Sequence, residues 1–106
     1  MGRLPEFFGG ITVFEWDEGN SAKNWMRHGV TQAEAEQVFF NRPLVIAEDP
    51  KHSTSESRSF ALGRTDNGTG LAVVFTFRGT LLRVISARPM SRKERNAYDQ
   101  VPPEAP

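Results

Sequence analysis

The chain has 106 residues, no cysteine, and equal numbers of basic and acidic side chains, 13 of each. This length suits one domain with a single hydrophobic core, and the lack of cysteine excludes disulfides and thiolate metal sites. No apolar run approaches the ~18 residues that cross a bilayer, and no secretory signal is visible. We therefore expect a cytoplasmic protein with no membrane partner.

The charges are unevenly distributed along the chain. Residues 1–56 carry nine acidic and five basic side chains, whereas residues 57–95 carry two acidic and eight basic ones. A basic segment inside a neutral protein suits phosphate binding. The alternative is a solvated surface on which the charges fall by chance.

The N-terminal half predicts one strand and two helices. Pro5 and the Gly9-Gly10 pair make residues 1–12 a flexible lead, and alternating apolar residues through Trp16 predict a first strand. Asp17 can cap a helix that Gly29 ends in the left-handed conformation. A second helix begins with the capping box Thr31-Gln32-Ala33-Glu34. It buries a stripe at helical spacing and stops at a proline: Ala35, Val38, Phe39, Pro43.

The C-terminal half predicts strands and one more helix. A short strand at 44–47 and an exposed polar loop at 48–57 precede strands at 58–64, 71–77 and 81–88. Asp66-Asn67-Gly68 favours a hairpin turn, and the nearly all-apolar stretch 71–77 suits a central strand buried on both faces. A second capping box, Ser91-Arg92-Lys93-Glu94, opens a helix to about Tyr98.

These elements predict an α+β fold, with an antiparallel sheet and helices packed on it. Residues 13–100 form the single domain, and the proline-rich residues 101–106 form a disordered tail.

The candidate chemistry is RNA cleavage without a metal. Such cleavage needs a base for the 2′-hydroxyl, an acid for the leaving 5′-oxygen, and cations that stabilise the phosphorane. Arginine suits the last role because its planar group matches phosphate oxygens and stays charged. Four arginines stand at or near predicted strand ends: Arg58, Arg64, Arg83 and Arg88. They could instead be exposed edge residues that discourage strand pairing.

Other polar and aromatic residues leave alternatives open. His28 and His52 have no ligand spacing, so we expect neither a metal nor another cofactor. His28 could transfer protons near neutral pH, or it could only complement the C-terminal dipole of its helix. Exposed aromatic side chains would favour a non-catalytic nucleic-acid- or protein-binding module, but Phe60, Phe75 and Phe77 fit a core.

Ordered motifs over about residues 13–98 resemble the BrnT family. Phe14-Glu15-Trp16-Asp17, Asn24 and Arg27-His28-Gly29-Val30 are similar to its first strand and helix. Arg58 with Leu62-Gly63, and Arg83-Val84-Ile85-Ser86-Ala87-Arg88, resemble two later strands. Arg92-Lys93-Glu94-Arg95 with Tyr98 resembles its last helix.

The resemblance implies a RelE-like ribonuclease toxin, with the element order β-α-α-β-β-β(-β)-α, that inhibits translation. It also implies a BrnA-like antitoxin with a ribbon-helix-helix domain. The complex would repress its own promoter, so that operator DNA is contacted only through the antitoxin. The implied site residues are His28, Arg58, Arg64, Arg83, Arg88 and Lys23. Lys23 stands one helical turn beyond the family's usual lysine, which is Asn20 here.

Strand geometry sets a condition on two of these arginines. Strict alternation places Arg83 on one face of its strand and Arg88 on the other. Both can therefore join one site only if the strand bulges between them or one acts from the sheet edge. Otherwise one of the two is structural or contacts the antitoxin.

Overall fold

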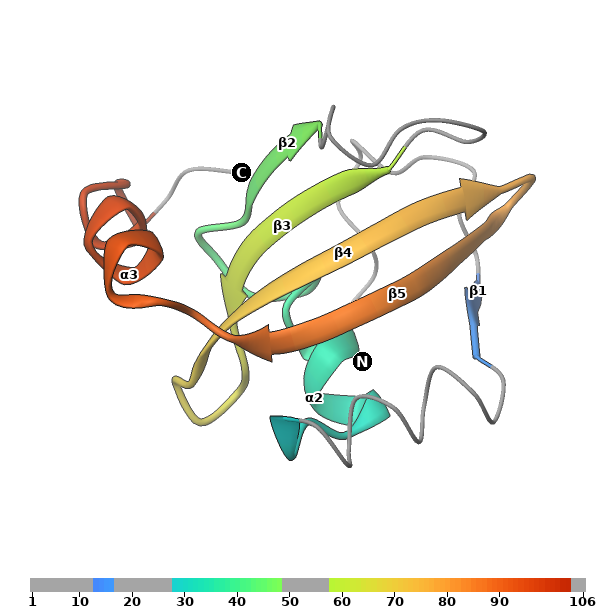
Figure 1. Cartoon of the computed structure of the whole chain (residues 1–106), viewed down its shortest axis with the longest axis horizontal. Helices are drawn as coiled ribbons and strands as arrows, with labels where there is room; N and C mark the ends of the chain where they lie inside the picture. Colours follow the sequence, from blue (N-terminus) through green and yellow to red (C-terminus); the bar gives the residue numbers. More distant parts are fainter. Residues whose placement is uncertain (1–12, 17–27, 49–57, 104–106) are drawn as a thin grey trace.

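A computed structural model describes residues 13–16, 28–48 and 58–103 of the chain (Figure 1). Its elements, in chain order, are β1 (Val13–Glu15), α2 (Gln32–Gln37), β2 (Val45–Glu48), β3 (Ser59–Arg64), β4 (Gly70–Arg78), β5 (Leu81–Pro89) and α3 (Arg92–Asp99). The α+β prediction is confirmed. The expected flexible lead, most of the first helix and most of the polar loop lie outside the described residues. No helix in the described part is long and apolar enough to cross a membrane.

The five described strands form one sheet in the order β1-β5-β4-β3-β2, with β4 at the centre as predicted. Three of the strand pairs are antiparallel. β1 pairs with β5 in parallel, with Val13 opposite Leu81 and Glu15 opposite Arg83. The prediction of a purely antiparallel sheet is therefore wrong. Alternation in a sequence shows which face a residue takes but not the direction in which an edge strand runs.

Helix α2 begins as predicted and ends early. The Thr31–Glu34 capping box is present, and the predicted stripe of Ala35, Val38 and Phe39 is fully buried. The helix itself stops at Gln37. After it, the N–H groups of Phe39 and Phe40 bond to carbonyls three residues back, at 3.1 and 3.0 Å. These tighter bonds close the last turn before Pro43 is reached.

Two hydrophobic clusters pack on opposite faces of the sheet. The larger one joins α2 to the sheet and contains Val30, Ala35, Val38, Phe39, Leu44, Ala61, Leu71, Val73, Phe75, Leu82, Val84 and Ala87. The smaller one lies under α3 and contains Leu62, Ala72, Met90 and Tyr98. Neighbouring strand residues face opposite sides, so we name the two sides the α2 face and the α3 face. Figure 1 shows α3 beyond one end of the sheet and β1 at its edge.

Strand β5 contains the bulge that is needed for Arg83 and Arg88 to lie on the same face. Val74 is opposite Ser86 and Phe75 is opposite Val84, so Ile85 is an extra residue in β5. Alternation is therefore reset, because one inserted residue shifts every later side chain to the other face. Arg83 and Arg88 consequently lie on the same, α3 face.

Candidate active site

Three of the predicted site residues share one surface, which we name the arginine face: the α3 face of the sheet at Arg64, Arg83 and Arg88. Arg83 is opposite Thr76 and Arg88 is opposite Ala72 on β4. These partners are four residues apart, which separates the two arginine Cα atoms by roughly 13 Å. Arg64 lies two residues after Leu62 on β3, so it points to the same face. Burial raises the pKa of Tyr98 in α3, and the positive charge of Arg64 opposes that shift.

The sheet between these arginines is only partly covered. Phe60, Val74 and Ser86 form one row across β3, β4 and β5, and all three are half-buried. Arg58 directly precedes Ser59, which is opposite Phe75. The described pairing of β3 with β4 starts at Ser59, so Arg58 lies immediately before the paired strand. The surface between the arginines is therefore partly apolar and partly polar, and positively charged side chains lie at both of its ends.

Arg83 is held by a carboxylate from the edge strand β1. Glu15 Oε1 lies 3.4 Å from Arg83 Nη1 and 3.7 Å from Arg78 Nη1. The parallel pairing of β1 with β5 produces this contact, because it places Glu15 opposite Arg83. The Arg83 side chain is 20% exposed and the Arg78 side chain 49%. One carboxylate therefore joins a half-buried and an exposed guanidinium.

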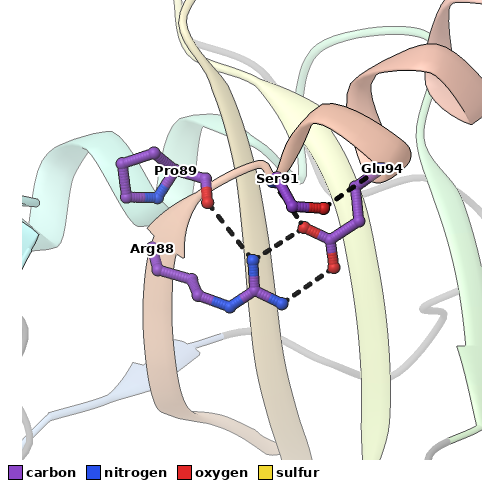
Figure 2. A network of polar contacts seen from close by, with 4 residues as sticks. All are labelled: Arg88, Pro89, Ser91 and Glu94. Atoms are coloured by element: carbon purple, nitrogen blue, oxygen red, sulfur yellow. Dashed lines mark hydrogen bonds and ion pairs between the residues drawn. The ribbon is translucent and has the colours of Figure 1, made fainter.

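Arg88 is held by the first turn of α3, as Figure 2 shows. Its Nη1 and Nη2 atoms donate to the two oxygens of Glu94, at 2.7 and 2.8 Å. Glu94 also completes the predicted capping box, since its Oε1 accepts the Ser91 N–H at 2.8 Å. Hydrogen bonding from Arg88 lowers the pKa of Glu94 from 4.5 to about 2, although burial opposes the shift. The same hydrogen bond raises the pKa of Arg88.

The other end of α3 is anchored as well. The Tyr98 hydroxyl donates a hydrogen bond of 2.6 Å to the carbonyl of Pro43. The ring of Tyr98 belongs to the cluster under α3. The helix that carries Glu94 is thus fixed by packing and by a buried hydrogen bond, which limits how far its first turn can shift.

His28 joins the fold on the other side of the sheet. It is exposed, its backbone is helical, and Gly29 follows with a φ of 66°, as the predicted left-handed cap requires. Val30, two residues later, packs in the cluster on the α2 face. The described contacts therefore do not bring His28 together with the arginine face. Lys23 lies outside the described residues.

The sequence interpretation missed three residues of this site. Glu94 was assigned only to a capping box and Thr76 only to a buried strand, and Arg78 was given no role. The structure pairs Glu94 with Arg88 and Arg78 with Glu15, and it leaves Thr76 2% exposed beside Arg83. The acidic residue six positions after Arg88 is a local signal that could have indicated the first pair. The second pair depends on the parallel register of β1 and has no local signal.

One aromatic prediction needs correction. Phe75 is buried as expected, but Phe77 is 44% exposed, and so is Phe40 at 39%. Phe77 lies at the end of β4, where its ring packs edge-on against Phe75 at 5.6 Å between centroids. Trp16 is partly buried and packs against the larger cluster, and its indole N–H donates to Glu36 Oε2 at 2.7 Å.

Within the described ranges, no group of three or more His, Cys, Asp and Glu residues could hold a metal ion. The polar groups that converge on the arginine face are guanidinium, carboxylate and hydroxyl groups. Arginines suit the binding of phosphate oxygens and the stabilisation of negative charge that develops on them.

Two comparisons with known proteins gave matches. A family model described as the ribonuclease toxin BrnT of a type II toxin–antitoxin system matches residues 16–94. The crystal structure of the Brucella abortus ribonuclease toxin BrnT is similar, with a TM-score of 0.55 and 26% sequence identity, over 76% of this chain and 99% of that one. A comparison with curated protein sequences gave no match. Because the family model covers most of the chain, the protein belongs to the BrnT family of ribonuclease toxins of type II toxin–antitoxin systems.

Proposed function

We propose that this chain is a metal-independent endoribonuclease toxin that cuts RNA at the arginine face and so inhibits translation. The observation that carries the proposal is the convergence of Arg64, Arg83 and Arg88 on one sheet face, through the bulge in β5. Cations fixed at such spacing can contact successive phosphates and the scissile one together. Membership of a ribonuclease toxin family supports the same chemistry.

The proposed reaction is a transesterification. The 2′-oxygen of the RNA attacks the adjacent phosphorus while a base takes its proton, and the P–O5′ bond breaks as an acid protonates the leaving oxygen. The guanidinium groups stabilise the charge of the phosphorane. Arg83 and Arg88 are the proposed principal cations, with Arg58 and Arg64 as further phosphate contacts. His28 and Lys23 remain proposed participants in proton transfer and substrate contact.

The proposed partner is a BrnA-like antitoxin with a ribbon-helix-helix domain. A type II family implies an antitoxin, and masking a basic surface favours acidic or apolar side chains from the partner. The complex would repress its own operon, with operator DNA contacted through the antitoxin alone. We place this system in the cytoplasm, where the RNA substrate is found.

A second candidate function is RNA binding without cleavage. The exposure of Phe40 and Phe77 favours it, because base stacking on aromatic rings is a common mode of single-strand recognition. A substrate with a 2′-deoxy group at the cleaved position separates the two functions, since it can be bound but cannot undergo transesterification.

The test is cleavage of RNA by the purified chain in excess EDTA. We expect cleavage of the ribose substrate at a rate unchanged by chelation, and no cleavage of the 2′-deoxy substrate. Loss of an established activity on chelation would contradict the metal-free mechanism. Equal binding of both substrates with no cleavage of either would support the second candidate.

A further inference from the structure

The guanidinium of Arg88 is fixed along one edge and open along another. Arginine has five N–H donors in a planar group. Nη1 donates to Glu94 at 2.7 Å and to the carbonyl of Pro89 at 3.2 Å, and Nη2 donates once to Glu94 at 2.8 Å. Among the residues that the structure describes, no hydrogen bond uses Nε–H or the second hydrogen of Nη2. These two donors share one edge of the group, and in Figure 2 that edge faces away from Glu94 and Pro89.

Glu94 is itself held before it binds Arg88. The Ser91 N–H donates to Glu94 Oε1, and the Glu94 N–H donates to Ser91 Oγ at 3.1 Å. The carboxylate is therefore fixed relative to the start of α3, and its side chain is only 19% exposed. Arg88 is 38% exposed at its side chain, so its remaining edge is accessible. The pair thus presents two parallel N–H groups in one fixed direction.

We propose that Glu94 is a positioning residue that holds Arg88 so that its Nε–Nη2 edge receives a phosphate of the RNA. The proposal rests on the proposed function, because it assumes that the arginine face is where RNA binds. Two parallel N–H donors match two oxygens of a phosphate group. The carboxylate binds the end of the guanidinium and the phosphate binds its side, so the two anions do not compete for the same hydrogens.

A purely structural role for the pair predicts something different. In that case the Arg88–Glu94 contact only fastens α3 to the end of β5, and its loss lowers stability without a specific effect on RNA. Glu34→Gln provides the control, because Glu34 occupies the same capping-box position in α2 and has no arginine contact among the described residues. Each variant is compared at a temperature at which thermal unfolding shows it to be folded.

The experiment is a double-mutant cycle on single-turnover RNA cleavage, using wild type, Glu94→Gln, Arg88→Ala and the double variant. We expect Glu94→Gln to slow cleavage by roughly tenfold or more, as misplacement of a catalytic group does, and Glu34→Gln to leave the rate unchanged. In the Arg88→Ala background, Glu94→Gln should have no further effect, because Glu94 acts through Arg88. An equal slowing by Glu94→Gln in both backgrounds, or no slowing in wild type, would overturn the proposal.

A second measurement keeps this test separate from that of the proposed function. The dissociation constant of an RNA with 2′-deoxy groups at the cleaved positions is measured at fixed salt for the same variants. If wild type binds but does not cleave, the proposed function fails, and a roughly tenfold weaker binding by Glu94→Gln still supports the positioning role. Equal affinities of wild type and Glu94→Gln in that case, or no binding by wild type, would overturn it.

Discussion

Arg83 and Arg88 each have a carboxylate partner before any substrate arrives. Glu15 lies 3.4 Å from Arg83, and Glu94 binds Arg88 through two hydrogen bonds of 2.7 and 2.8 Å. A long side chain that is already oriented loses less rotational freedom when it binds a ligand. Both guanidinium groups are therefore already oriented for contact with phosphate. Some of their N–H donors are used by the carboxylates.

The first prediction concerns these two arginines. We expect Arg83→Ala and Arg88→Ala each to reduce RNA cleavage by ~10²-fold or more, because charge stabilisation in the transition state is lost. Single-turnover rates and thermal unfolding are measured together. Arg95→Ala is the control, since it removes one exposed positive charge from α3. Full activity in both variants, or a loss explained by unfolding alone, would show that the assignment is wrong.

The second prediction concerns the pH dependence of stability. The folded-state pKa of Glu94 is lowered from 4.5 to about 2, so its stabilising effect is present above pH 4.5 and is lost as the pH falls toward 2. We expect Glu94→Gln to cost about 1 kcal/mol of unfolding free energy at neutral pH, since both partners keep some solvent contact. This difference from wild type should shrink between pH 4.5 and 2.

Urea unfolding at several pH values measures this difference. Glu34→Gln is the matched control, because Glu34 occupies the same capping-box position in α2 and has no arginine contact among the described residues. A cost of Glu94→Gln that stays constant down to pH 2 would mean that the Arg88 pair does not contribute. A cost of Glu34→Gln with the same pH dependence would point to capping instead.

At the scale of elements, β5 shows what the sequence could and could not predict. The approximate boundaries of β5, its antiparallel pairing with β4 and the position of its arginines near the strand ends could be predicted from composition and alternation. The bulge at Ile85 could not, because Arg83 to Arg88 contains no glycine and its adjacent apolar pair, Val84-Ile85, also fits a regular strand that is partly buried on both faces. Only the β4 register, with Val74 opposite Ser86 and Phe75 opposite Val84, reveals the extra residue.

The strand β1 gives a similar lesson. Its apolar pattern was recognisable, yet its partner β5 lies at the far end of the chain and its direction is set by the path between them. The Glu15–Arg83 contact depends entirely on that pairing. Local capping boxes at Thr31 and Ser91 were predictable because all their interactions fall within four residues.

The third prediction tests the close approach of β3 to α2. A Cβ added at Gly63 would lie 2.6 Å from Val38 Cγ1 and 3.1 Å from the Val38 carbonyl oxygen. We expect Gly63→Ala to destabilise the protein by about 1–3 kcal/mol, as overpacking of a core does. Gly70→Ala is the comparison, since its nearest contact would be the flexible end of Met90 at 2.9 Å. Urea unfolding should rank Gly63→Ala as the more destabilised; the reverse order would contradict the packing described for β3.

At the scale of the whole molecule, the two faces of the sheet have different roles, one in stability and one in carrying charge. The α2 face holds the larger hydrophobic cluster, whereas the α3 face carries the arginines and one smaller cluster at its end. Stability and charge are thus placed on different sides, so the arginine face can be altered without opening the main core. This division also leaves the charged side available to a protein that must block it.

The fourth prediction concerns that protein. We expect the chain to form a tight complex with the product of the neighbouring gene and to lose RNA cleavage in that complex, because in our proposal the antitoxin covers the arginine face. Co-purification followed by a cleavage assay measures both properties. A stable complex with undiminished activity would contradict inhibition by occlusion, and the absence of any complex would contradict the pairing.

The central claim is that the arginine face catalyses metal-free transesterification, and the chemical ends of the RNA products test it most directly. In excess EDTA, we expect wild type to produce fragments with a 2′,3′-cyclic phosphate and a 5′-hydroxyl, the groups left when the 2′-oxygen attacks and the P–O5′ bond breaks. Arg83→Ala and Arg88→Ala should produce the same ends at rates lower by ~10²-fold or more. Fragments with 5′-phosphate ends, or cleavage that requires an added metal ion, would contradict the account.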